Sequence, residues 1–144
     1  MSMEVIHLKP PENFNPLEVV GCSVECNREI LLLLRQDHKS AGNQWGEAAG
    51  KVEKGEDKFD AMRRELFEET GISKNKDDLT FRETFYFRNM NGDIIYHSFG
   101  LRLEEKPEII IDRSCHKEYI WTTKEKALNL DLIHDLDFLI DRYF

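Results

Sequence analysis

Residues 50–72 read Gly-Lys-Val-Glu-Lys-Gly-Glu-Asp-Lys-Phe-Asp-Ala-Met-Arg-Arg-Glu-Leu-Phe-Glu-Glu-Thr-Gly-Ile and hold the most regular pattern in the chain. If residues 57–70 form a helix with about 100° between neighbours, Phe59, Met62 and Leu66 lie on one stripe. Such a stripe is typical of a helix that packs one face against a core. The stretch therefore predicts an amphipathic helix over residues 57–70.

The same helix would carry Glu65, Glu68 and Glu69 close together on a different face. Like charges this close repel one another, and they do so more strongly as solvent is excluded. The ordinary interpretation of an acidic run is a solvated surface. A bound cation is the alternative, and all-oxygen ligands favour Mg²⁺, Mn²⁺ or Ca²⁺. Because Mg²⁺ completes its shell with water and phosphate oxygens, the pattern predicts a site for a phosphorylated substrate.

The residues on either side of the carboxylates support this hypothesis. Gly50 and Gly55 bracket a loop that leads into the helix, and a backbone carbonyl from such a loop can serve as one more metal ligand. Arg64 precedes Glu68 by four residues, so it can orient a carboxylate or hold a phosphate. Gly71 follows the helix as a suitable C-terminal cap.

Taken as a whole, the spacing is G-x5-E-x7-R-E-U-x-E-E-x-G-U, where U is a bulky apolar residue. This pattern resembles the signature of the Nudix hydrolases, and every specified position is occupied. A chance match is on the order of 10⁻⁹ per starting position at ordinary residue frequencies. The resemblance implies an α/β fold, namely an α/β/α sandwich with a mixed sheet, and hydrolysis of a diphosphate linkage in a nucleoside diphosphate joined to another group. It also implies Mg²⁺ or Mn²⁺ as the cofactor.

The resemblance further implies a function for each matching residue. The catalytic set is Arg64, Glu65, Glu68 and Glu69, and the metal ligands are Gly50 (through its carbonyl), Glu56, Glu65, Glu68 and Glu69. In the family, the residue matching Glu65 is a metal ligand or the general base, and the arginine matching Arg64 orients the glutamates. The residue matching Glu56 commonly assists a second metal or braces the loop.

A further carboxylate outside this stretch often completes such a site in the family. Glu118 is our candidate for this additional metal ligand, and Asp112 and Glu83 compete for the same function. One departure from the family pattern lies at the entrance of the stretch. Many members have Pro-Gly-Gly there, whereas this chain has Ala48, Ala49 and Gly50, so the contacts of this loop with substrate are open.

The rest of the chain predicts one domain over residues 1–144, with an irregular lead-in at 1–16. Alternating or apolar runs predict strands over 17–26, 30–35, 80–88, 94–103, 109–111 and 118–121. Within 80–88, we expect Phe81, Glu83, Phe85 and Phe87 to share one face. A capping box formed by Thr122 and Glu125 predicts a short helix, and a second amphipathic helix follows over 132–143.

Composition excludes several classes of protein. The net charge is -8, from 28 acidic and 20 basic residues, which argues against stable binding to a nucleic-acid backbone. No apolar run approaches the ~20 residues that span a bilayer, and the first residues do not resemble a signal peptide, so no membrane partner is expected. Three cysteines without metal-type spacing favour reduced thiols and a cytoplasmic location.

The partner we expect is a small-molecule nucleotide, and a compact chain of this kind fits a nucleoside triphosphate pyrophosphatase best. Tyr86 and Phe85 are the candidates for contact with the substrate, although Phe85 also fits an ordinary core position. Three alternatives stay open: a non-catalytic Nudix-fold sensor or binding module, an isomerase acting on an isoprenoid diphosphate, and, for the assembly, a homodimer.

Overall fold

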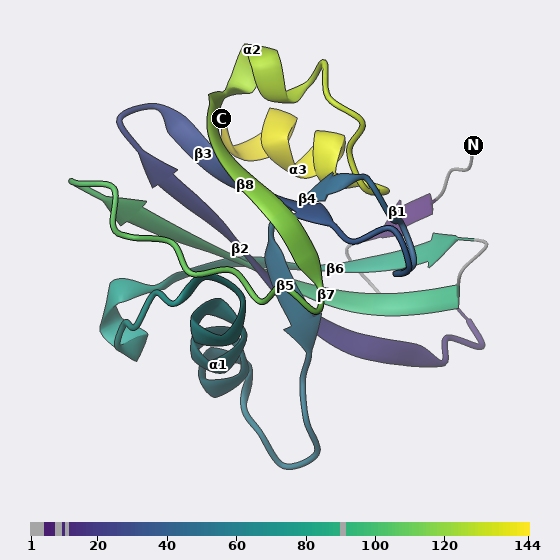
Figure 1. The fold of residues 1–144 in the computed structure, drawn as a ribbon. Coiled ribbons are helices and arrows are strands. Elements are labelled where there is room, and N and C mark those ends of the chain that lie inside the picture. The colour runs from purple at the N-terminus through teal and green to yellow at the C-terminus, as the bar shows by residue number, and fades with distance from the viewer. Residues whose placement is uncertain (1–4, 8–9, 11, 90–91) are drawn as a thin grey trace.

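The computed structural model of the chain describes residues 5–7, 10, 12–89 and 92–144 (Figure 1). The strands are β1 (Val5–His7), β2 (Pro16–Cys26), β3 (Glu29–Arg35), β4 (Trp45–Gly46), β5 (Ala48–Lys51), β6 (Thr80–Asn89), β7 (Gly92–Leu103) and β8 (His116–Thr123). The helices are α1 (Lys58–Thr70), the 3-10 turn η1 (Lys76–Asp78), α2 (Lys124–Ala127) and α3 (Leu136–Tyr143). None of the helices in this described part is both long and apolar enough to cross a membrane.

The strands form one mixed sheet in the order β1-β6-β7-β2-β3-β4, with β5 paired to β2 and β8 paired to β3. Strand β2 runs parallel to β7, and the other described pairs are antiparallel. On its other side, β2 pairs first with β5 over Val19–Cys22 and then with β3 at Glu25 and Cys26. Strand β3 therefore diverges from β2, and β5 pairs with β2 along the part that β3 leaves.

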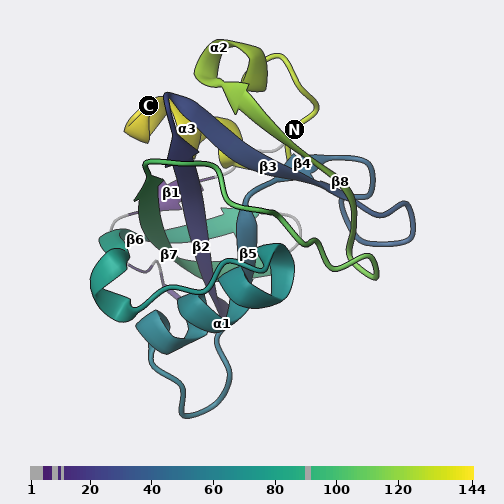
Figure 2. The ribbon, with the colours of Figure 1, turned by 60° about the vertical axis from the view of Figure 1, so that its left-hand side comes forward.

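Helices cover both faces of this sheet. Helix α1 lies on one side, and α2 and α3 lie on the other, in both views (Figure 1, Figure 2). Each side has its own apolar core: Met62 and Leu66 of α1 belong to one, and Leu139 and Ile140 of α3 belong to the other. This arrangement confirms the predicted α/β/α sandwich with a mixed sheet.

Helix α1 forms where the sequence predicted it. The Asp57 side chain caps its first turn by accepting a hydrogen bond from the amide of Asp60, and Gly71 ends it in a left-handed conformation with a φ of 78°. Met62 and Leu66 are fully buried, and Phe59 packs against the same core. The carboxylate face is thus held in place by the apolar stripe on the other side of the helix.

Three local predictions about the strands need correction. The predicted lead-in at 1–16 contains β1, which pairs with β6, and β2 already begins at Pro16. Residues 109–111 do not form a strand; they cross the end of α1, where the amide of Ile110 donates to the carbonyl of Thr70 over 2.8 Å. In β6, a register shift between Phe81 and Glu83 changes which face the following residues occupy.

This register shift separates Phe81 from the other residues that were expected to share its face. Phe81 packs against the α1 core, whereas Phe85 and Phe87 belong to the α3 core. The extra residue is Arg82, because Phe81 pairs with Phe99 and Glu83 pairs with Ser98. The strict alternation of the sequence therefore gave the wrong face for Phe81.

The helical segments after β8 are also shorter than predicted. The first helix is capped by Thr123, which accepts from the amide of Lys126, and not by Thr122. The last helix begins at Leu136 and not at 132, because Leu132 forms a bridge with Trp45 of β4. Consequently, residues 131–133 run alongside β4 before α3 starts.

Candidate functional site

Helix α1 and strand β5 lie side by side, and the predicted carboxylates lie on or beside their contact. The amide of Ala49 donates to Glu69 Oε1 over 3.0 Å, so the backbone of β5 holds this carboxylate directly. A Cβ atom placed on Gly50 would lie 2.0 Å from the Glu65 carboxyl carbon. The absence of a side chain at Gly50 is therefore what lets the Glu65 carboxyl group approach the strand.

Arg64 connects the remaining members of the acidic cluster. Its guanidinium group donates to both oxygens of Glu56, at 2.8 and 2.9 Å, and to Glu65 Oε2 at 3.0 Å. It also reaches Glu68 Oε1 at 3.3 Å and the carbonyl of Lys51 at 3.0 Å. Because arginine presents several donors in a fixed plane, it fixes the orientation of these carboxylates relative to β5.

Burial and mutual repulsion shift the proton affinities of this cluster. Burial raises the pKa of Glu69 to about 8, with a further increase from the charges of Glu65 and Asp112. Burial also raises the pKa of Glu65, against the lowering effect of Arg64. The hydrogen bonds from Arg64 lower the pKa of Glu56. The carboxylates next to β5 are thus destabilised as anions, which a nearby cation would relieve.

The donor chemistry of the cluster fits a hard divalent cation. The available atoms are carboxylate oxygens from Glu65, Glu68 and Glu69 and backbone carbonyls of β5, which is the ligand type that Mg²⁺ and Mn²⁺ prefer. Within the described residues, however, no three acidic, histidine or cysteine side chains converge on one point in the geometry of a metal site. Arg64 occupies part of the coordination capacity of these carboxylates instead.

The carboxylates predicted outside α1 occupy three different environments. Glu118 is exposed on β8, opposite Leu34, and makes no ion pair with a described residue. Glu83 forms an ion pair with Arg142 of α3. Asp112 is held by Ser114, whose hydrogen bonds lower its pKa, and its charge acts on Glu69. Of the three, Asp112 is the one whose charge raises the pKa of Glu69.

A cavity of about 360 Å³ begins at Gly50 and Lys51 and extends away from α1. Its apolar walls come from β6, β7, the segment before α3, and α3 itself. They are formed by Phe87, Ile94, Tyr96, Ile133, Leu136 and Leu139. Arg35 and Glu47 add charged groups to the lining. The cavity thus combines mostly apolar walls with a few charged groups.

The two residues predicted to contact substrate do not line this cavity. Phe85 is only 1% exposed and packs edge-on against Phe138 of α3, with ring centroids 5.4 Å apart. Tyr86 points to the opposite face of β6, where its ring contacts Phe14. The aromatic residues that do line the cavity are Phe87 and Tyr96.

Sequence reasoning did not single out Arg35 or the pair of Glu47 and Tyr96 for this site. Arg35 ends β3 beside the cavity, and its charge acts on Glu69. Glu47 lies between β4 and β5, is only 7% exposed, and accepts a short hydrogen bond from the Tyr96 hydroxyl group. An acidic residue between Trp45 and Ala48, in an otherwise apolar stretch, was the available indication for Glu47.

Comparisons with known proteins agree with this geometry. The NUDIX domain family matches residues 16–142. The CTP pyrophosphohydrolase of Escherichia coli (strain K12) is 30% identical over 118 residues, which cover 81% of this chain and 82% of that protein.

Two solved structures share the fold. The MutT protein from Methanosarcina mazei Go1 superimposes with a TM-score of 0.76 at 22% identity, covering 92% of this chain and 95% of that one. The E. coli dihydroneopterin triphosphate pyrophosphohydrolase has a TM-score of 0.76 at 20% identity and covers 90% of this chain and 96% of its own. Together with the complete acidic pattern on α1, the family match shows that this chain belongs to the Nudix hydrolases.

Proposed function

We propose that this protein is a Mg²⁺- or Mn²⁺-dependent pyrophosphohydrolase that converts a nucleoside triphosphate into a nucleoside monophosphate and pyrophosphate. The observation that carries the proposal is the acidic cluster of α1 packed against Gly50, at the mouth of a cavity of about 360 Å³. A triphosphate could lie against the cluster while its nucleoside part enters the cavity. The CTP pyrophosphohydrolase relative supports CTP or a close analogue as the first substrate to test.

The cation would be held by Glu65, Glu68 and Glu69, with the Gly50 carbonyl as a further ligand. Bound there, it would supply the positive charge that neutralises phosphate oxygens in the transition state. Glu56 contributes by anchoring Arg64, which in turn orients Glu65. Asp112 is a better candidate than Glu118 for an additional carboxylate, because its charge acts on Glu69.

The residues of the chain would assist attack of water on phosphorus. Glu65 lies against the backbone of β5 and is held by Arg64, so it is suited to accept the proton of the attacking water. Arg35, at the edge of the cavity, is suited to bind a phosphate oxygen. Water would be added across the P–O–P bridge between the α- and β-phosphates, and nucleoside monophosphate and pyrophosphate would be released.

The test is an assay of the purified protein with Mg²⁺ or Mn²⁺ and a panel containing CTP, UTP, ATP, GTP, ADP-ribose and a dinucleoside polyphosphate. We expect release of nucleoside monophosphate and pyrophosphate from at least one triphosphate. The variant Glu69→Gln should lose most of this activity, since it removes a charge that the cation requires. Identification of the co-product shows which bond was cut.

The matched control is Glu105→Gln, which changes an exposed glutamate in the loop after β7 and should leave turnover unchanged. Equal turnover by wild type and Glu69→Gln would refute the assignment of the acidic cluster. Binding of a nucleotide without turnover of any panel member would instead favour the non-catalytic sensor.

A further inference from the structure

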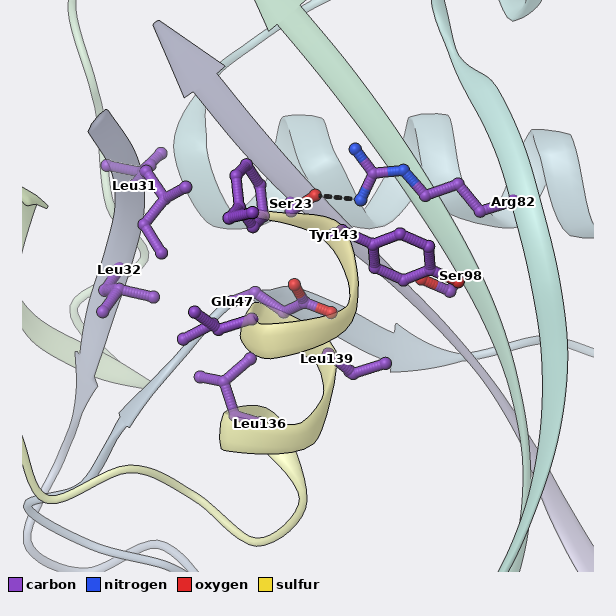
Figure 3. A pocket seen from close by; sticks show the side chains of 12 residues that line it. Ser23, Leu31, Leu32, Glu47, Arg82, Ser98, Leu136, Leu139 and Tyr143 are labelled. Atoms are coloured by element: carbon purple, nitrogen blue, oxygen red, sulfur yellow. Dashed lines mark hydrogen bonds between the residues drawn. The ribbon is translucent and has the colours of Figure 1, made fainter. Parts of the chain in front are cut away.

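Glu47 is a buried ionisable side chain at a wall shared by two cavities. It lines the cavity of about 360 Å³ described above and a second one of about 10 Å³, large enough for one water molecule. Figure 3 shows its carboxyl group extending beneath α3, with Leu136 and Leu139 alongside. The residue is only 7% exposed.

The described residues provide only part of the hydrogen bonding that this carboxyl group can accept. The Tyr96 hydroxyl group donates to Oε2, whereas Oε1 accepts no hydrogen bond from any residue that the structure describes. Arg82 is near enough for its charge to act on Glu47, but its guanidinium group donates to Ser23 Oγ over 2.6 Å. An apolar residue would fill this position at lower cost to the fold, because burial of a carboxylate is unfavourable.

The position of Glu47 relative to Gly50 matches the dimensions of a nucleotide. Gly50 follows Glu47 by three positions, which in extended chain is a span on the order of 10 Å. This span is comparable with the distance from the α-phosphate to the far edge of the base in a nucleoside monophosphate. A nucleotide with its phosphates at Gly50 would therefore place its base between the apolar walls, with the polar edge of the base at Glu47.

We propose that Glu47, positioned by Tyr96, is a specificity-determining residue that accepts a hydrogen bond from an exocyclic amino group of the nucleobase. The ligand class is a nucleotide whose base carries an amino group beside an unprotonated ring nitrogen, as cytosine and adenine do. The identification of the ligand as a nucleotide rests on the proposed function. The proposed hydrolysis requires no such selectivity.

The chemistry of the carboxyl group explains the direction of the preference. An ionised carboxylate only accepts hydrogen bonds, so it attracts an amino group and repels the carbonyl oxygen that uracil carries in the same place. A neutral carboxyl group can accept from the amino group and donate to the adjacent ring nitrogen. A buried polar group that loses its partner is strongly destabilised, which makes such a site discriminating.

The test measures equilibrium binding of monophosphates by titration calorimetry, which needs no turnover. CMP and UMP form one pair: the base of CMP carries an amino group where that of UMP carries a carbonyl oxygen. AMP and IMP form a second pair with the same difference. For the wild type, we expect the amino member of at least one pair to bind roughly tenfold more tightly or better. Methionine is apolar and similar in length to glutamate. In Glu47→Met, the ratio of the two dissociation constants within each pair should therefore fall to about one.

Tyr96→Phe should weaken the preference for the amino member without abolishing it, because it removes only the hydroxyl group that positions the Glu47 carboxyl group. Glu105→Met is the matched control on the surface and should keep the wild-type ratio. If Glu47→Met does not fold, as judged by circular dichroism, Glu47→Ala takes its place with the same expected result.

The outcomes separate this inference from the proposed function. Equal binding of the amino and oxo members by the wild type, or binding of neither pair, overturns the inference. The inference is also overturned if a folded Glu47 variant still binds the amino member of a pair more tightly than the oxo member. A preference that depends on Glu47 in a protein that hydrolyses no triphosphate supports the inference and refutes the hydrolase proposal.

Discussion

Gly50 is the residue at which the backbone of β5 comes closest to the acidic cluster. An added Cβ would lie 2.0 Å from the Glu65 carboxyl carbon and 2.2 Å from one of its oxygens. In Gly50→Ala, the flexible end of Glu65 must therefore move, and displacement of a reacting group by about 1 Å can cost on the order of 100-fold in rate. We predict that kcat falls roughly tenfold or more while the melting temperature changes little, as measured by steady-state kinetics and calorimetry.

Gly55 provides the matched comparison for this prediction. It has a φ of 83°, and no atom lies within 4 Å of an added Cβ. Gly55→Ala should therefore lower the free energy of unfolding by about 1 kcal/mol through backbone strain and leave kcat near the wild-type value. If Gly50→Ala keeps full activity, the close approach of Glu65 to β5 does not matter for catalysis.

The residues of the site differ in how well the sequence could predict them. The grouping of Glu65, Glu68 and Glu69 follows from helical spacing alone, because all three lie on one helix. Glu47 and Tyr96 are 49 positions apart and meet only through the pairing of β2 with both β5 and β7. No local pattern records such a contact, so the side chains that line the cavity emerged only from the structure.

At the scale of the element, the end of α1 allows a stability prediction. Gly71 has a φ of 78°, a left-handed conformation, and an added Cβ would lie 3.2 Å from the Ile110 Cβ atom. Gly71→Ala should therefore lower the free energy of unfolding by about 1 kcal/mol or somewhat more. Urea unfolding measures the change, and kcat below the unfolding transition should remain unaltered. An unchanged midpoint would show that this cap contributes little to the stability of the helix.

Elements with strong local determinants were predicted well, and elements fixed by distant partners were not. Helix α1 has both of its caps and its apolar stripe in consecutive sequence. The register shift in β6 depends on pairing with β7, and the late start of α3 depends on the bridge between Leu132 and Trp45. Both features come from contacts between segments that are separated in sequence, which periodicity alone does not reveal.

At the scale of the molecule, β5 separates two regions with different chemistry. On one side lies α1 with its carboxylates, and on the other lies the cavity bounded by β6, β7 and α3. Because β5 pairs with β2 while β3 leaves toward β8, the sheet opens at this strand. The fold therefore places an acidic, cation-favouring surface next to an apolar cavity, joined through Gly50.

The buried carboxyl group of Glu47, in the wall of that cavity, affects the stability of the whole molecule. Burial raises the pKa of Glu47 to about 7 from its ordinary value of 4.5, despite the opposing hydrogen bond from Tyr96. Between these two values the folded protein keeps a proton that the unfolded chain releases. The contribution of this group to the free energy of unfolding therefore decreases as the pH rises from 4.5 to 7, and it stays low above that range. The protein is thus less stable at the higher pH.

The variant Glu47→Gln removes this titration and keeps the size of the side chain. We predict that the free energy of unfolding of this variant, minus that of wild type, increases by about 2 kcal/mol between pH 5 and pH 8, because only wild type loses stability over that range. Urea unfolding without added metal at both values gives the difference, and any constant cost of the amide cancels in this comparison. Glu105→Gln, on the exposed loop, should show no such trend. If the difference between Glu47→Gln and wild type is the same at both pH values, Glu47 titrates normally in the folded protein, and its burial does not control the stability of this fold.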